Sequence, residues 1–406
     1  MKRIRLVLGW VIFLLYHLIT GQFVKAQTVE DALDEILRDG DFSLDGELLT
    51  EQDLAELLGD DDLADLLEQR NWELDLKFRS GFGYGDNVLY GAYEKIGSGY
   101  LFGAIDGFYY RNVEDSPWNA FLYFYGEHLE YFEDVDAGRL YVTQGQVSRL
   151  TANQDKTVGL SATHIFYDQV FDASADLDTF DTFGVSAHQY EAVPFVDFHF
   201  QGGWLFRAEG MFGGSRYEDS YDDSDSVGGL LKLKRTMGKR SDVSLEYSYE
   251  ARDYLEKVNR DSEGYSVGGL LNLKVGIAML QYRLQPKEDG WAYRTQLSHY
   301  TQRDGEAGYT DYDRVRVSQS ASKAWDKWDL LLSARHTWYD YPVRTAEFGS
   351  TETLYRRALE ANANLSWDLS EDSAVFLETQ FERNESNSAD NVFSASRVVL
   401  GVEWSL

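Results

Sequence analysis

The sequence predicts an all-β protein, a transmembrane antiparallel up-and-down β-barrel of about 16 strands preceded by a short N-terminal helical extension. Three observations predict this fold. Helical spacing gives way at Trp72 to a two-residue alternation of apolar and polar side chains. That alternation recurs to the end of the chain, and long and short connections alternate between the strands. A length of 406 residues suits one large barrel.

The amino-acid composition limits which kinds of partner and metal site the protein can have. The chain has 69 acidic and 38 basic residues, which gives a net charge of −31. Its overall field would repel nucleic acid, so we expect no nucleic-acid partner. Aromatic residues make up 15% of the chain and only 4 residues are proline, which is the opposite of a disordered composition. The absence of cysteine excludes disulfides and thiolate metal sites, and we expect no metal and no cofactor.

Residues 1–26 have the features of a signal peptide. Lys2, Arg3 and Arg5 form a basic start, residues 6–19 are mainly apolar, and small residues precede a cleavage site after Ala26. The apolar run is shorter than the roughly 17–25 residues that a spanning helix needs. We therefore predict Sec-dependent export with cleavage near Ala26 and, because a barrel follows, location in the outer membrane of a Gram-negative cell.

Residues 27–70 form an acidic segment with helical spacing. Leucines recur at helical intervals in 53–58 and 62–67, and Thr50 is a suitable N-cap. We expect a short helical extension on the periplasmic side. Two interpretations stay open, a partly mobile extension or a plug or docking helix for a periplasmic partner.

Residues 71–406 are predicted to form the barrel. Trp72, Leu74 and Leu76 alternate with charged residues, and the last strand carries Val398, Leu400, Val402, Trp404 and Leu406 on one face. In a membrane barrel the apolar face meets lipid and the polar face lines the lumen. The alternative fold is a soluble β-sandwich, in which the inner faces of two sheets form one core. Nearly every second residue here is polar and many are charged, and this pattern does not favour a sandwich.

The predicted strands number sixteen, although fourteen or eighteen also fit the pattern. Residues 264–285 contain no convincing turn and are predicted as one long strand. Long acidic loops are predicted at 168–182, 215–225, 303–312 and 340–353, and short turns at 200–203, 236–241, 324–328 and 367–373. The predicted strands are 72–85, 97–111, 117–130, 137–150, 155–168, 183–199, 203–217, 222–236, 241–254, 264–285, 290–303, 310–324, 328–340, 352–367, 373–384 and 391–406.

The first predicted strand and its loop carry a resemblance to known proteins. Residues 80–88, Ser-Gly-Phe-Gly-Tyr-Gly-Asp-Asn-Val, resemble the opening "G-x-x-Asp-Asn" segment of outer-membrane β-barrel porin families. Some members are accessory to exopolysaccharide export. The resemblance implies an outer-membrane channel that is inserted by the barrel assembly machinery. Such proteins usually end on an aromatic residue, whereas this sequence ends on Leu406 with Trp404 two residues earlier.

The alternation predicts which charged residues face the lumen. Five arginines on four successive strands are expected to form a basic wall, and five glutamates are expected to oppose it, so that the pore carries a transverse field. The arginines are Arg294, Arg314, Arg316, Arg335 and Arg356, and the glutamates are Glu246, Glu250, Glu360, Glu378 and Glu382. The alternative is that these charges pair with one another and fill a closed interior.

Other polar and aromatic groups point less clearly to a site. The acidic loop residues 218–225 and 172–181 lack the glycine and final Glu of a calcium loop, so we expect solvated loop tips. Aromatic residues crowd 88–132, and we expect most of them to face lipid. Ser161 lies near His164 in the sequence, and Ser186 near His188, but neither pair forms a recognisable hydrolase motif, so we predict no enzymatic activity.

The sequence therefore favours a channel that passes hydrophilic solutes or exports a polysaccharide. The first alternative is a non-conducting scaffold barrel that docks periplasmic partners through residues 27–70, and a barrel-wall hydrolase is the less favoured one. Expected partners are outer-membrane lipid and lipopolysaccharide, the assembly machinery and a periplasmic protein. The solute and the oligomeric state stay open.

Overall fold

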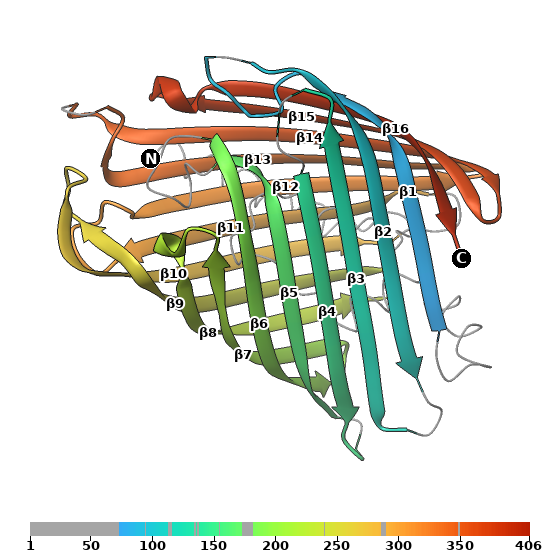
Figure 1. The fold of residues 1–406 in the computed structure, drawn as a ribbon. Coiled ribbons are helices and arrows are strands. Elements are labelled where there is room, and N and C mark those ends of the chain that lie inside the picture. Colours follow the sequence, from blue (N-terminus) through green and yellow to red (C-terminus); the bar gives the residue numbers. More distant parts are fainter. Residues whose placement is uncertain are drawn as a thin grey trace.

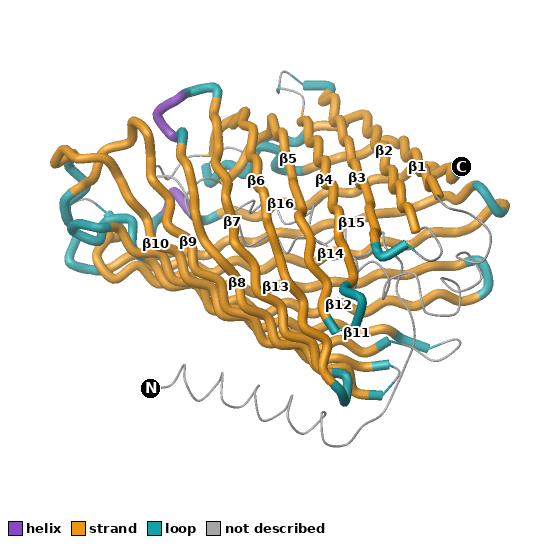
Figure 2. The backbone as a smooth tube through the Cα atoms, turned by 90° about the horizontal axis from the view of Figure 1, so that it is seen from below, coloured by secondary structure: helices purple, strands orange, loops and turns teal. Residues whose placement is uncertain are grey.

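The computed structural model describes residues 73–93, 95–112, 116–133, 135, 138–153, 155–172, 182–238, 240–285, 290–347 and 350–406. The predicted signal peptide, residues 1–26, and the predicted extension, residues 27–70, lie outside the described residues. The remaining chain forms one antiparallel sheet that closes on itself (Figures 1 and 2).

The described residues form sixteen strands, each hydrogen-bonded to the strands before and after it, and β1 pairs with β16 to close the barrel. The expected barrel and strand number are confirmed, and β10 confirms the long strand predicted at 264–285. The strands are β1 (Glu73–Gly85), β2 (Ser98–Asn112), β3 (Trp118–Tyr131), β4 (Gly138–Leu150), β5 (Lys156–Asp172), β6 (Thr182–Phe200), β7 (Trp204–Tyr217), β8 (Ser224–Met237), β9 (Ser241–Arg260), β10 (Ser266–Leu284), β11 (Ala292–Asp304), β12 (Tyr312–Trp325), β13 (Trp328–Thr345), β14 (Thr353–Ser370), β15 (Ser373–Ser386) and β16 (Phe393–Ser405).

The connections follow the predicted alternation in length. One end of the barrel, where β16 finishes, carries the short turns 201–203, 238–240, 326–327 and 371–372, and we call it the short-turn end. The opposite, long-loop end carries 86–97, 218–223, 305–311 and 346–352. The connection 285–291 is an exception, because it is long and lies at the short-turn end. Two consecutive glycines with positive φ, Gly202 and Gly203, make the tight turn between β6 and β7.

Several strands extend further than the sequence predicts, β5 to Asp172 and β14 to Ser370 among them, and the extension is longest in β9 and β13. β9 continues to Arg260 and β13 to Thr345, instead of ending near 254 and 340. Pairing resumes beyond an irregularity in each case, between Ser266 and Arg260 and between Thr345 and Thr353. The buried positions change parity at each irregularity, so the two-residue alternation is interrupted although the strand continues.

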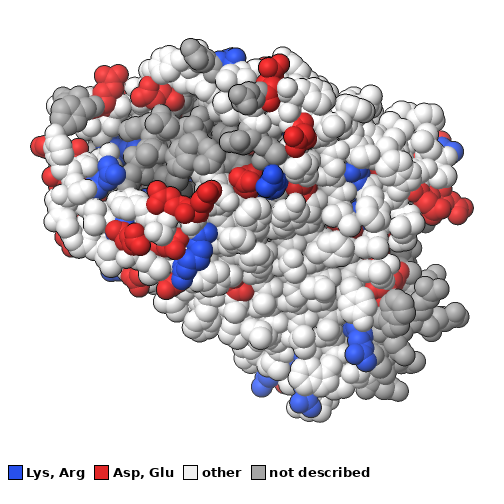
Figure 3. Space-filling view, in the orientation of Figure 1, with Lys and Arg blue, Asp and Glu red and all other residues white. Residues whose placement is uncertain are grey.

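The exterior of the barrel is apolar. Alternate residues on each strand point outward, among them Leu245 and Leu400, which are 57% and 58% exposed. Tryptophans gather on the exterior at the short-turn end, where Trp328 and Trp367 stack with ring centroids 5.7 Å apart. Figure 3 shows that much of the wall in view carries no charge. An apolar band bordered by aromatic residues is the exterior of a transmembrane barrel. None of the described residues forms a helix long and apolar enough to cross a membrane.

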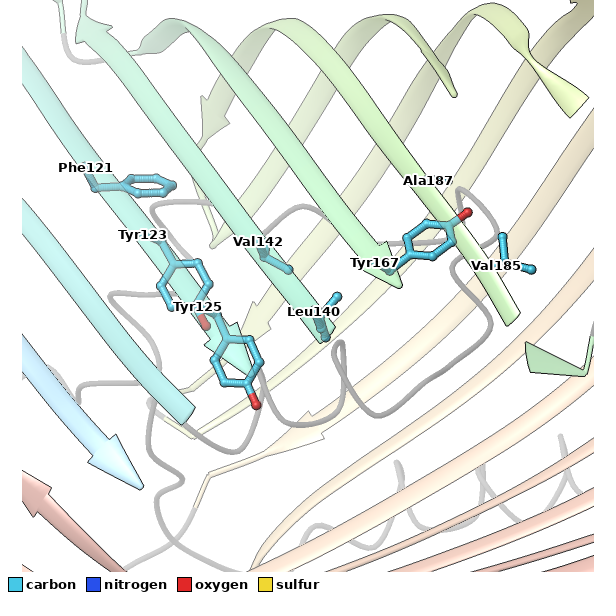
Figure 4. Packing of buried hydrophobic residues seen from close by; sticks show 8 residues of the cluster. All are labelled: Phe121, Tyr123, Tyr125, Leu140, Val142, Tyr167, Val185 and Ala187. Atoms are coloured by element: carbon cyan, nitrogen blue, oxygen red, sulfur yellow. The ribbon is translucent and has the colours of Figure 1, made fainter. Parts of the chain in front are cut away.

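The interior of β3 to β6 is lined by a cluster of aromatic and aliphatic side chains (Figure 4). Phe121, Tyr123 and Tyr125 lie at alternate positions of β3, next to Leu140 and Val142 of β4. We expected most aromatic residues of 88–132 to face lipid, and for several this is wrong. The interior ones are Tyr100, Phe102, Phe108, Tyr110, Tyr123 and Tyr125, whereas Tyr109 and Trp118 occupy exterior positions.

Candidate functional site: the charged interior wall

The five predicted arginines lie on the interior face of four adjacent strands. Arg294 is on β11, Arg314 and Arg316 are on β12, Arg335 is on β13 and Arg356 is on β14. Each arginine is separated by an even number of residues from a buried interior side chain of its own strand. Tyr300 on β11 and Leu354 on β14 are examples of such side chains. Because side chains alternate between the faces of a strand, the arginines share the interior with those residues.

Tyrosines support the arginines at the long-loop half of this wall. The rings of Tyr300 and Tyr312 stack with their centroids 5.2 Å apart, and Tyr339 lies 5.9 Å from Tyr312. The guanidinium of Arg314 lies over the ring of Tyr300 at 4.4 Å, and that of Arg356 lies 5.1 Å from the ring of Tyr339. Arg314 is only 1% exposed. Stacking on an aromatic face fixes the plane of a guanidinium and favours its charge.

These tyrosines are not among the residues that the sequence predicts for the site. The signal was present, because Tyr300, Tyr312 and Tyr339 have the parity of the arginines on their own strands. The wall therefore combines arginines and tyrosines on β11, β12 and β13 and is not a row of charges alone.

Amide side chains hold the edges of the wall. The Nε of Arg294 donates to Oε1 of Gln281 over 2.9 Å, and Gln296 donates to the same oxygen over 2.7 Å. On the other side, the Nε of Arg356 donates to Oδ1 of Asn384 over 2.8 Å. Such hydrogen bonds orient an arginine without neutralising its charge.

The five predicted glutamates are also on the interior face, and basic groups lie beside Glu246, Glu250, Glu360 and Glu378. Glu360 accepts from Arg335 over 3.1 Å. Glu246 pairs with Lys232 at 3.1 Å and Glu250 with Arg252 at 3.2 Å. Glu378 lies 3.2 Å from Arg79 and 3.8 Å from Arg397. Glu382 is the register partner of Glu360 on the next strand.

These glutamates do not oppose the arginine wall as expected. They are on β9, β14 and β15, which flank or overlap the strands that carry the arginines, β11 to β14. The strand halfway round the closed ring from β12 is β4, whose interior carries Leu140, Val142, Gln144 and Gln146. Arg314 and Arg316 on β12 therefore lie opposite a neutral strand, whereas β3 and β6, opposite β11 and β14, carry Glu127 and Glu191 at interior positions. Alternation identifies the face of a strand but not its position around the ring, which explains the error.

Two further groups of ion pairs lie outside the predicted set. Arg207 and Asp197 pair on β7 and β6, and both are buried. At the seam between β1 and β16, Lys77 lies 3.5 Å and Arg79 lies 3.7 Å from the carboxylate of Glu403. The interior thus carries paired charges around much of its circumference.

The other candidate groups of the sequence are placed as follows. Ser161 is buried on the interior of β5, whereas His164 is exposed on the exterior, so these two residues lie on opposite faces of one strand. In the loop after β7, Asp222 pairs with Lys257 at 2.8 Å and Asp223 accepts from the backbone N–H of Tyr217 over 2.7 Å. Within the described part of the chain, no group of three or more His, Asp or Glu side chains is arranged to hold a metal ion.

Comparison with known proteins finds similarity at the level of solved structures. No family model and no curated protein matches the chain. A "bacterial polysaccharide outer membrane secretin" is 10% identical over 83% of this chain and 100% of its own, with a TM-score of 0.44. An anion-selective porin from Comamonas acidovorans is 13% identical over 82% of this chain and 99% of its own, also with a TM-score of 0.44. A BenF-like porin from Pseudomonas fluorescens is 9% identical over 83% of this chain and 99% of its own, with a TM-score of 0.45.

Proposed function

We propose that this protein is an outer-membrane channel that passes hydrophilic solutes. The observation that carries the proposal is the cluster of five arginines on the interior of β11 to β14. A barrel of sixteen strands is wide enough to enclose an aqueous channel, and its apolar exterior suits a lipid environment. Charged side chains on the inner wall then decide which ions and solutes enter.

The finer proposal is that the channel favours anionic solutes, including acidic polysaccharides during export. Guanidinium groups bind carboxylate and phosphate through parallel hydrogen bonds. Tyr300, Tyr312 and Tyr339 add aromatic faces beside Arg314 and Arg356. The interior of β4, which lies opposite β12, carries no charged residue, so an anion would be drawn toward the arginine side of the lumen. A sugar polymer with acidic groups offers both the charge and the flat ring surfaces that such a wall binds.

A second candidate, a non-conducting scaffold barrel, is favoured by the burial of the interior charges. Arg314 and Arg207 are almost completely buried, and the carboxylates of Asp197 and Glu378 are buried beside basic groups. In this case the wall charges stabilise the barrel, and a periplasmic partner binds residues 27–70. The two candidates differ in conductance, which makes them separable.

The proposed setting follows from the same features. The basic and apolar start of the chain supports export with cleavage near Ala26, and the exterior supports contact with outer-membrane lipid and lipopolysaccharide. We expect insertion by the barrel assembly machinery, and this proposal includes no enzymatic step.

The deciding experiment is single-channel conductance in a planar lipid bilayer, with the mature chain and with a variant lacking residues 27–70. Steady conductance of the mature chain with a preference for anions is the expected result. Conductance that is present only in the deletion variant would make residues 27–70 a plug. Silence of both proteins, with binding of a periplasmic protein that is lost on deletion, would overturn the channel proposal in favour of the scaffold.

A further inference from the structure

Two histidines lie side by side on the exterior of the barrel. His164 on β5 and His188 on β6 are both exposed, and both occupy outward positions, like Leu160 and Tyr190. The Nε2 atom of His164 is 3.1 Å from the Nδ1 atom of His188. Their rings stack with centroids 5.3 Å apart and an angle of 22° between the planes.

Neighbouring aromatic rings fix the positions of the two imidazoles. The ring of Phe166 lies 4.8 Å from that of His188, and the ring of Tyr141 on β4 stacks on Phe166 at 5.8 Å. The backbone register pairs Phe166 with His188 and His164 with Tyr190, so the two histidines are diagonal neighbours on adjacent strands. A stack of four rings from three hydrogen-bonded strands therefore holds the two nitrogen atoms close together.

We propose that His164 and His188 form a binding site for a transition-metal cation of the Zn²⁺, Ni²⁺ or Cu²⁺ class. Metal–nitrogen bonds to histidine are about 2.0–2.1 Å long, so two nitrogens on one ion at roughly tetrahedral or square geometry are about 3 Å apart. The observed separation already matches this requirement. Small rotations of the rings would direct both nitrogen lone pairs at one ion, with no movement of the strands.

The chemistry of the donors sets the class of ion. In the metal-free pair, one of the two facing nitrogens carries a proton and donates a hydrogen bond to the other. When the ion binds, that proton moves to the other nitrogen of the same ring, so both imidazoles stay neutral and no proton is lost. Neutral imidazole suits Zn²⁺, Ni²⁺ and Cu²⁺, whereas Mg²⁺ and Ca²⁺ prefer oxygen ligands. Water completes the coordination of an ion held by two side chains.

Another exterior histidine provides a matched control. His336 on β13 is a single imidazole that stacks on Trp338 with ring centroids 3.9 Å apart. It is half-buried on the same exterior face of the barrel, and no second imidazole among the described residues is in contact with it. A metal that bound exterior histidines in general would bind His336 as well.

The test is titration of the folded full-length barrel, without an affinity tag and in detergent, with Zn²⁺ or Cu²⁺ alone. We expect one ion per barrel in calorimetry and a Cu²⁺ electron paramagnetic resonance spectrum with two nitrogen ligands. His164→Ala and His188→Ala should each weaken binding by roughly tenfold or more and leave one nitrogen ligand, since each removes one of two ligands. His336→Ala should change neither result, and Mg²⁺ should not compete.

Two outcomes would overturn the proposal. One is the absence of saturable binding by the unmodified barrel. The other is binding that His164→Ala and His188→Ala leave unchanged, or that His336→Ala weakens equally. Both substituted side chains are exposed, and heat-modifiable electrophoretic mobility would verify that the variants are folded. Neither outcome depends on whether the barrel conducts ions.

Discussion

Arg207 on β7 and Asp197 on β6 form a bidentate ion pair inside the barrel. The Nε and Nη2 atoms of Arg207 donate to the two carboxylate oxygens of Asp197, and each hydrogen bond is 2.6 Å long. The two residues are register partners, and they are 4% and 5% exposed. The guanidinium also lies 4.4 Å from the ring of Phe195. A buried pair of this geometry fixes the relative position of two adjacent strands.

Removing one partner of this pair should destabilise the barrel. Asp197→Ala leaves a buried guanidinium without its main carboxylate partner, which typically costs about 3–5 kcal/mol. We expect the lower end of this range, because Glu209 stays 3.4 Å from Arg207. Urea unfolding in lipid vesicles, followed by tryptophan fluorescence, measures the change.

The control for this prediction replaces both partners. Asp197→Leu combined with Arg207→Met removes both charges and keeps side-chain volume, so most of the lost free energy of unfolding should return. If the double variant is as unstable as Asp197→Ala, the loss comes from packing and not from the uncompensated charge.

The barrel could be predicted from the sequence because a membrane barrel is the fold that accommodates apolar and polar alternation repeated over so many strands. The strand positions agree closely, as in β10, where the absence of a turn over 264–285 predicts the single strand Ser266–Leu284. The ends of β9 and β13 could not be predicted, because the register shifts there and the buried positions change parity, from Tyr254 to Lys257 in β9 and from Tyr341 to Arg344 in β13.

The second prediction concerns the stability of the seam where β1 pairs with β16 to close the barrel. Gly401 on β16 and Gly81 on β1 are register partners, and a methyl group on Gly401 would collide with the carbonyl oxygen of Ser80 and the ring of Phe376. Gly401→Ala should therefore lower the free energy of unfolding by about 1–3 kcal/mol, the usual cost of overpacking. The temperature at which the folded electrophoretic form disappears gives a direct comparison.

Gly103 on β2 offers a matched control for the seam. A methyl group there would meet no atom within 4 Å, so Gly103→Ala should change stability by less than about 0.5 kcal/mol. Equal effects of the two substitutions would show that strand glycines matter here for a reason other than close approach at the seam.

The candidate site could be predicted only in part. Arg314 and Arg316 alternate with Val315 and Val317, so the sequence indicates which face they share. β3 lacks this contrast, because Phe121, Tyr123 and Tyr125 alternate with Leu122 and Phe124, and both faces are apolar. The distribution of charge around the ring depends on closure between β1 and β16, which the alternation within single strands does not specify.

The loop between β11 and β12 should depend on pH through Asp311. Burial raises the pKa of this carboxyl, and the nearby carboxylate of Asp304 adds to the effect. A raised pKa in the folded state means that the contribution to stability is present below the unfolded pKa, near about 3.9, and is lost as the pH rises through the folded value. Protection factors from hydrogen exchange in the loop should therefore fall over that interval.

Two substitutions test this assignment. Asp311→Asn keeps an oxygen that can accept from the backbone N–H of Asp304, which now donates to Asp311 over 2.6 Å, and should remove the pH dependence. Glu306→Gln changes an exposed residue of the same loop and should leave the dependence in place. A pH dependence that persists in Asp311→Asn would assign it to another group.

Arg356 and Arg357 provide the sharpest test of ion preference, because they are consecutive residues on opposite faces of β14. Arg356 is buried on the interior, where it lies over Tyr339, whereas Arg357 is exposed on the exterior beside Tyr355. Arg356→Gln should lower the anion-to-cation permeability ratio by roughly two- to fivefold, because one charge acting through water contributes about 1 kcal/mol or less.

Arg357→Gln removes the same charge from the same strand but from the lipid-facing side, so the permeability ratio should not change. Reversal potentials in a salt gradient measure both variants under one condition. An equal shift in the two variants would mean that the preference arises from the net charge of the barrel. A shift in neither would remove the arginine wall as the selective element even if the barrel conducts, because Arg356 is a buried member of the wall held between Tyr339 and Asn384.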